Sequence, residues 1–116
     1  MKNQYFGDIN DYRKYGLIRR ILKTYDFKLL VAWMLTPDDG TPDGKFIDYL
    51  HKPLKWEKYD NELFHGIKNL IYQSNNRKVS LIEQTDLLPS TRYFSNIVPD
   101  SHDSRRLWEQ ELITQT

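Results

Sequence analysis

The chain has 116 residues, of which 39% are hydrophobic and 28% are charged, which is enough for one modest core and not for several domains. Its formal net charge of +1 gives no support to a strongly electrostatic nucleic-acid binder, so any basic patch must be local. The absence of cysteine excludes disulfide bonds, a thiol nucleophile and a zinc–thiolate site.

The first predicted element is an amphipathic helix over residues 11–24. Gly7 allows a chain reversal before it, and Asp8, Asn10 or Asp11 can cap its free N–H groups. The side chains whose helical spacing predicts its buried face are Tyr15, Ile18, Leu22 and Tyr25. The basic side chains expected on its exposed side are Arg13, Lys14, Arg19, Arg20 and Lys23. This side could contact an anion or nucleic-acid phosphates, or it could simply be the solvated face of a capped helix.

The next predicted element is a strand over residues 28–35. This segment is almost continuously apolar, which is typical of a strand buried on both faces of a parallel sheet. Its apolar run, 29–35, is too short to span a membrane, and residues 1–4 lack the apolar core of a signal peptide. We therefore expect a cytoplasmic protein that makes no membrane contact.

Turn-forming residues fill the following segment, 36–44, because its prolines and glycines exclude regular structure. A dinucleotide-binding turn needs closely spaced glycines at this place, whereas here Gly40 and Gly44 stand apart between acidic residues. The sequence therefore disfavours a dinucleotide. The carboxylates that could gather a divalent cation are Asp38, Asp39, Asp43 and Asp48. Their spacing does not match a calcium-binding loop, so we predict turns and no metal site.

The remaining segments continue an alternation of helices and strands. In chain order we expect a short helix at 46–50, an interruption at Pro53, a helix at 61–73, strands at 79–83 and 92–98, and a helix at 101–112. This order implies parallel strands joined by crossover connections. We therefore predict a single α/β domain over 1–116, an incomplete Rossmann-like fold that is doubly wound, mainly parallel and three-layered.

Ligands of such sheets bind beyond the carboxyl ends of the strands. The places to expect a ligand are therefore the loop after Leu35 and Glu83, which ends the predicted strand 79–83. An acidic residue in that position commonly accepts hydrogen bonds from a ribose diol, although Glu83 could equally be a solvated acid. Trp33 and Trp56 could stack a base, and Trp33 is the better candidate for the core.

The residues Gly7, Asp8, Asp11, Lys14 and Tyr15 form a dense motif of fixed spacing. This motif resembles the N-terminal motif of the ribosomal-RNA adenine-N6 methyltransferases, in which it precedes the first strand and lies beside the S-adenosylmethionine pocket. A longer set of segments, within 4–19, 33–40 and 43–45, resembles a group of mostly uncharacterised bacterial proteins. Those proteins continue into a strand that closes with Asp-Pro-Asp-Asn-Gly, which is similar to the methyltransferase catalytic loop.

The resemblance implies a domain that binds S-adenosylmethionine or a nucleotide. Asp11 and Lys14 would position the cofactor or the substrate, and Glu83 would hold the ribose. The turn after the first strand would line the amino-acid end of the cofactor. In this sequence the cofactor-binding residues would then be Asp11, Lys14, Asp38, Asp39, Gly40 and Glu83.

Catalysis is a separate question, because the sequence contains no Asp-Pro-Pro or Asn-Pro-Pro tripeptide. In adenine methyltransferases that tripeptide supplies the acceptor for the target amino group. We therefore expect no adenine methylation by this chain alone, and we assign no catalytic residue.

A second interpretation belongs to a different class of protein. It is a shortened, noncatalytic binding module, encoded by a phage or another mobile element, that inhibits a protein or captures a nucleotide signal. A nucleic acid or another protein is a candidate partner under both interpretations. We also predict a homodimer, because a few strands with so apolar a run leave an open sheet edge. The expected contact is that edge or the helix 101–112, with Trp108 as its aromatic anchor.

Overall fold

The computed structural model describes residues 1–74 and 76–116, and in this part of the chain helices alternate with two strands. The strands are β1 (Leu29–Ala32) and β2 (Thr91–Phe94). The α-helices are α1 (Ile9–Thr24), α2 (Pro53–Trp56), α3 (Asn61–Ser74), α4 (Ser80–Glu83) and α5 (His102–Gln115). The 3-10 helices are η1 (Asn3–Tyr5), η2 (Asp48–His51) and η3 (Glu57–Tyr59). The domain is therefore mixed α/β, as the order of the predicted elements indicated.

β1 and β2 pair in parallel, with Leu29 opposite Thr91 at the start of the register. The parallel pairing expected from the sequence is confirmed, but each strand is only four residues long. The predicted strand 28–35 is too long because Met34 has a φ of 51°, a left-handed conformation that a continuous strand does not contain. All four residues of β1 are half-buried, so the prediction that both faces of this strand are fully buried is wrong.

The strand predicted at residues 79–83 is wrong, because this segment contains the helix α4. Val79 and Ile82 are buried, whereas Leu81 and Glu83 are half-buried. A spacing of three between buried side chains suits a helical turn, and a run this short cannot be assigned by its periodicity alone. Glu83 therefore ends a helix and not a strand.

The helix predicted at 11–24 is confirmed as α1, but its buried face differs from the predicted one. Tyr15 is buried as expected. Arg19, expected on the exposed side, is only 1% exposed, and Tyr25, expected on the buried side, is exposed. The buried face instead follows Tyr12, Tyr15 and Arg19, whose spacing of three and four residues also suits a helix.

The strand predicted at 92–98 corresponds to β2, which ends at Phe94, so the prediction extends four residues too far. The remaining predictions of local structure agree with the observed elements. The segment 36–44 is irregular, and the short helix expected near 46–50 is η2. Pro53 does not only interrupt the chain, since it begins α2 in the first-turn position where proline is tolerated. The helices predicted at 61–73 and 101–112 are α3 and α5.

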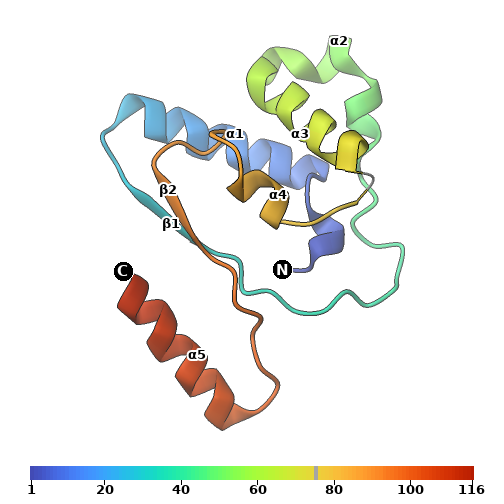
Figure 1. The fold of residues 1–116 in the computed structure, drawn as a ribbon. Helices are drawn as coiled ribbons and strands as arrows, with labels where there is room; N and C mark the ends of the chain where they lie inside the picture. The colour runs from blue at the N-terminus through green and yellow to red at the C-terminus, as the bar shows by residue number, and fades with distance from the viewer. Residues whose placement is uncertain (75) are drawn as a thin grey trace.

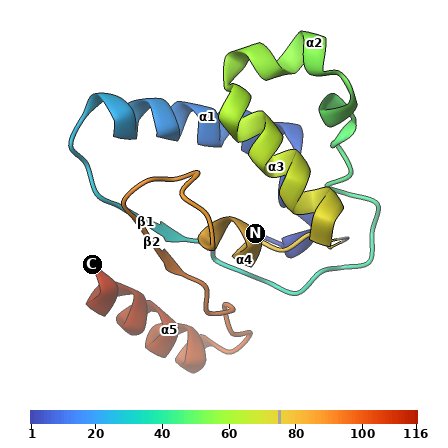
Figure 2. The ribbon, with the colours of Figure 1, turned by 45° about the horizontal axis from the view of Figure 1, so that its top comes forward.

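Helices lie on both sides of the strand pair. Figures 1 and 2 show α1 and α3 on one side of β1 and β2, and α5 on the other. The ring of Tyr15 in α1 meets that of Trp33, directly after β1, edge to face with centroids 6.4 Å apart. On the opposite side, Trp108 of α5 meets Phe94 of β2 with centroids 5.5 Å apart. These two aromatic contacts attach α1 and α5 to the small sheet.

The hydrophobic core lies mainly between α1, α3 and the segments around α4. Its fully buried apolar side chains are Phe6, Leu50, Leu63, Phe64, Ile67 and Ile82. By contrast, α5 buries no residue. In the described part of the chain, no helix has the length and apolar character needed to traverse a lipid bilayer.

Candidate binding groove

The opening motif forms a connected set of hydrogen bonds at the start of α1. Asp8 Oδ1 accepts the backbone N–H of Asp11 at 2.9 Å, and Asp11 Oδ2 accepts the N–H of Gly7 at 2.9 Å. Lys14 Nζ lies 3.1 Å from Asp11 Oδ1. Burial raises the pKa of the Asp8 carboxyl above its ordinary value. The structure thus brings Asp11 and Lys14 together, and it uses both carboxylates to hold the turn into the helix.

Gly7 is required by the packing of this turn. Its φ is 79°, and an added Cβ would lie 2.5 Å from Ile71 Cδ1 in α3. The Gly7 carbonyl also accepts the Tyr49 hydroxyl at 2.8 Å. Part of the opening motif is therefore explained by folding, because it joins α1 to α3 and η2.

The acidic turn after β1 is fastened to the beginning of the chain. Asp38 Oδ1 accepts the Gln4 N–H at 3.1 Å, and Asp39 Oδ1 accepts the Gln4 side-chain amide at 3.0 Å. The Thr41 hydroxyl donates to Asp39 Oδ1 at 2.6 Å, and these hydrogen bonds lower the pKa of Asp39 to about 2. Gly40 is exposed with a φ of 72°. Among the described residues, no group of three or more acidic or histidine side chains is placed to hold a metal ion.

Glu83 lies at the carboxyl ends of both strands, although it belongs to α4. Its Oε1 accepts Trp33 Nε1–H at 2.8 Å and the Ser95 hydroxyl at 2.5 Å. Trp33 directly follows β1 and Ser95 directly follows β2. Burial, together with the nearby Glu83 carboxylate, raises the pKa of Tyr93 to about 12. Glu83 therefore joins the two strand ends.

The predicted site residues fall into separate hydrogen-bonded sets. Arg77, which was not predicted from the sequence, links the segment before the opening motif to the end of the acidic turn. Its Nε donates to the Phe6 carbonyl at 2.8 Å, and its Nη1 donates to the Gly44 carbonyl. No hydrogen bond or ion pair between described residues joins Glu83 to Asp11. The side chains predicted to bind the cofactor therefore do not together line one pocket.

A continuous hollow lies elsewhere, on the outer side of α1. One part has a volume of about 500 Å³, and the adjoining part has a volume of about 360 Å³. Both parts are lined by Gly16, Arg20, Tyr59 and Asp60, so they form one trough between α1 and the segment from α2 to the start of α3. We call this surface the α1 groove. Its other lining residues are Tyr12, Arg13, Leu17, Arg19, Lys23, Trp56, Lys58 and Asn61.

The second wall of the α1 groove is attached to α1 by partly buried polar contacts. The Tyr12 hydroxyl donates to the Trp56 carbonyl at 2.6 Å and accepts the Asp60 N–H at 3.1 Å. Arg19 Nε lies 2.7 Å from Asp60 Oδ2, and Asp60 Oδ1 accepts the Leu63 N–H at 3.1 Å in the first turn of α3. These bonds therefore join the two walls of the groove directly.

The charge of the α1 groove is strongly positive although the whole chain carries only +1. Arg19 neutralises Asp60, which is the acidic residue among the lining residues. The remaining lining cations are Arg13, Arg20, Lys23 and Lys58, and among the described residues none of them has a carboxylate within 4.0 Å. These cations are therefore available to an anionic ligand.

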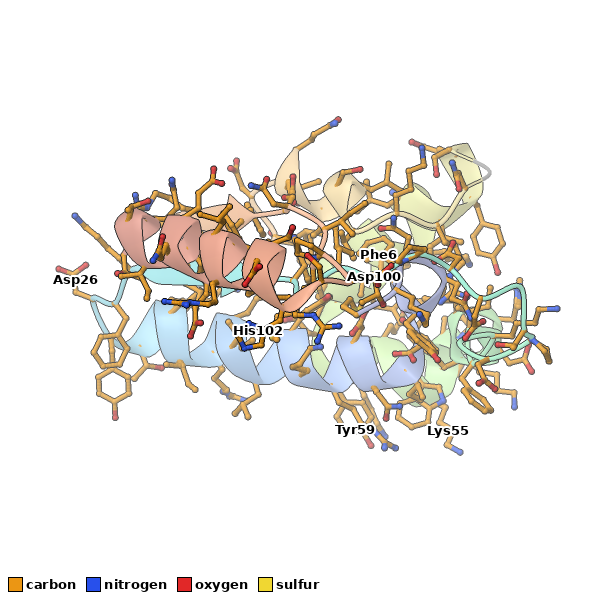
Figure 3. All side chains as sticks on the ribbon, turned by 90° about the horizontal axis from the view of Figure 1, so that it is seen from below. Phe6, Asp26, Lys55, Tyr59, Asp100 and His102 are labelled. Carbon is orange, nitrogen blue, oxygen red and sulfur yellow. The ribbon has the colours of Figure 1, made fainter. Side chains whose placement is uncertain are left out.

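Aromatic rings form the second wall of the groove. Trp56 and Tyr59 have ring centroids 6.0 Å apart, and Tyr59 is 65% exposed. The Arg13 guanidinium lies 5.6 Å from the Trp56 ring centroid, and Lys58 Nζ lies 5.4 Å from that of Tyr59. Figure 3 shows Tyr59 and Lys55 at the edge of α1 that is farther from α5, where α5 does not cover them. Cations therefore lie among one exposed ring, that of Tyr59, and one half-buried ring, that of Trp56, on the same surface.

The sequence indicated part of this surface. Arg13, Arg20 and Lys23 belong to the basic side predicted for the first helix, and Trp56 was a candidate for base stacking. Tyr59 and Lys58 were not among the residues predicted from the sequence. The signal that could have found them is the local run of aromatic and basic residues at 55–59, although nothing in that run shows that it packs against α1.

Comparison with known proteins adds no relative. No protein-family model matches the chain, and no curated protein or solved structure matches it. The resemblance to the adenine-N6 methyltransferases therefore stays a prediction from sequence motifs.

Proposed function

We propose that this domain is a binding module for a nucleotide-type ligand and that the α1 groove is its binding surface. One observation carries the proposal: exposed Tyr59, next to Trp56, lines a groove in which four further lining cations have no carboxylate within 4.0 Å among the described residues, namely Arg13, Arg20, Lys23 and Lys58. A ring can stack on a base, and a cation can bind the phosphate beside it.

The burial pattern supports a binding role over a purely structural one. Folding already uses Tyr12 and Arg19, whose polar groups hold the two walls together. Tyr59 and Arg20 remain exposed in the same groove, so the structure does not need their side chains for its core. Exposed aromatic and basic side chains on a rigid support are typical of recognition surfaces.

The proposal is tested by titrating the protein with ATP and following its tryptophan fluorescence, since Trp56 lines the groove. We expect quenching by ATP, and about tenfold weaker binding for Tyr59→Ala, because stacking contributes roughly 1–3 kcal/mol per base. Lys45→Ala is the matched control, since Lys45 is exposed and does not line the groove. Unchanged fluorescence with ATP, or equal affinity of Tyr59→Ala, would contradict the proposal.

We propose S-adenosylmethionine as a second ligand, in keeping with a Rossmann-like architecture. The observation that favours it is the position of Glu83, which receives hydrogen bonds from the residues that follow β1 and β2. Ligands of parallel sheets bind at such strand ends. S-adenosylmethionine should then raise the melting temperature, and Glu83→Gln should abolish that shift while Tyr59→Ala preserves it. A flat thermal profile with this ligand would refute the second candidate only.

A further inference from the structure

We infer that the α1 groove binds single-stranded nucleic acid, an inference that rests on the proposed nucleotide-binding function of this groove. The length of the groove favours a strand over a single nucleotide. Its cations on α1 extend from Arg13 to Lys23, which at 1.5 Å per residue corresponds to about 15 Å along the helix axis. The phosphates of a mononucleotide lie together at one end of the molecule, so they could not contact cations spread over this distance.

Both walls of the groove carry positive charge. Arg13, Arg20 and Lys23 lie on the α1 wall, and Lys58 lies on the opposite wall. A strand that lies in the trough would have its phosphates close to cations along its path, as in grooves that track a nucleic-acid backbone.

The Trp56 and Tyr59 rings of the groove are placed to stack on bases. The Trp56 and Tyr59 rings are tilted by 51° to each other and lie next to the cations, not at an isolated end of the groove. Stacking on these rings requires a base whose face is free. The bases within a duplex are stacked on one another and do not offer this face, whereas the bases of an unpaired strand do.

The experiment is fluorescence anisotropy with labelled single-stranded DNA and RNA of mixed sequence, a hairpin duplex of the same length, and unlabelled AMP and inorganic polyphosphate as competitors. We expect at least one single-stranded probe to bind tenfold or more tightly than the duplex. Comparison of the DNA and RNA probes shows which sugar the groove accepts. Tyr59→Ala should weaken strand binding about tenfold, and Tyr59→Phe should preserve it, because phenylalanine keeps the ring.

The dependence of strand affinity on salt concentration gives a second measurement. Removal of a cation that only supports the fold would not change this dependence. The slope of log affinity against log salt should become less steep by about 0.7 for each contacting cation removed by Arg20→Ala or Lys23→Ala. Lys45→Ala and Lys78→Ala, which change exposed lysines outside the groove, should leave the slope unchanged. Circular dichroism spectra of the variants are compared with that of the unmodified protein to check that each variant is folded.

The outcomes separate this inference from the function on which it rests. Binding of the duplex as tight as that of the single strand, or tighter, would overturn the inference. So would polyphosphate that displaces the labelled strand as well, per phosphate, as unlabelled strand does. If ATP and AMP bind at the groove as tightly as the oligonucleotides, the inference fails and the nucleotide-binding function remains. If no phosphate ligand binds, the strand-binding inference and the proposed nucleotide-binding function are both refuted.

Discussion

Replacement of Arg19 should be the most destabilising single change on α1, because its guanidinium is buried and holds three parts of the chain. Its Nε contacts Asp60 Oδ2 at 2.7 Å, its Nη1 donates to the Leu87 carbonyl at 2.5 Å, and its Nη2 lies 3.5 Å from Glu62 Oε2. Arg19→Ala would leave the Asp60 carboxylate and the Leu87 carbonyl without their partner.

The magnitude follows from the burial of these groups. Removal of one partner from a buried ion pair costs roughly 3–5 kcal/mol, and the lower part of this range applies because the Asp60 side chain is 17% exposed and water can reach it. We expect Arg19→Ala to lower the free energy of unfolding by about 3 kcal/mol. Arg19→Lys keeps the charge but not the planar fork, so it should lose roughly half as much.

Urea denaturation followed by circular dichroism measures this change. With a slope of about 2 kcal/mol per molar urea, a loss of about 3 kcal/mol moves the midpoint by roughly 1.5 M. The control is Arg20→Ala, which removes the next, exposed arginine and should change the unfolding free energy by no more than about 0.5 kcal/mol. A loss below about 1 kcal/mol for Arg19→Ala, or an equal loss for both variants, would refute this account of the buried contacts.

Four further predictions concern other parts of the fold. Gly16→Ala should raise the unfolding free energy by about 0.5–1 kcal/mol in the same urea experiment, because the added Cβ has only Leu63 Cδ2 near it, at 3.9 Å, and glycine is unfavourable inside a helix. Tyr93 has its pKa raised to about 12, so its contribution to stability is present below pH 10 and declines as the pH rises from 10 to 12. Tyr93→Phe should make the melting-temperature profile less steep over this range, in which Tyr15 and Tyr49 still contribute because burial raises their pKa values too, and an unchanged profile would contradict the prediction. Light scattering should give twice the 14.0 kDa chain mass at micromolar concentration, since the two described strands leave open sheet edges, and a monomer at high concentration would refute the homodimer. Trp108 of α5 contacts Phe94 of β2 within the same chain, so Trp108→Ala should detach α5 from the sheet and lower the melting temperature.

The sequence predicted the long helices well because their signals are local. The start of α1 is capped by Asp8, and α3 buries Leu63, Phe64, Ile67 and Ile71 at helical spacing. A window of fourteen residues contains enough apolar positions to establish its period. The parallel pairing of β1 and β2 followed in turn from the order of the elements.

The errors arose where tertiary contacts decide the environment of a residue. Val79 and Ile82 provide a single pair of buried positions, which fits a short strand as well as a helical turn. Arg19 reads as a surface arginine until Asp60 and the Leu87 carbonyl are known to surround it.

The candidate site shows the same division. The basic face of α1 is visible in the sequence, but the aromatic wall opposite it is separated by more than thirty residues and is placed there by Tyr12 and Asp60. Local patterns contain no information about that contact.

The wide separation of the two strands along the chain also has a consequence for folding. β1 begins at Leu29 and pairs with Thr91, so about sixty residues must be ordered or enclosed before the sheet can close. For a flexible loop of this length the entropic cost of closure is roughly 4 kcal/mol, and it must be met by contacts made within the enclosed segment. Trp33 stacks on Tyr93 across the closed pair with centroids 5.8 Å apart. The near-ultraviolet signal of this stack therefore reports closure of the sheet, separately from the far-ultraviolet signal of helices that form from neighbouring residues.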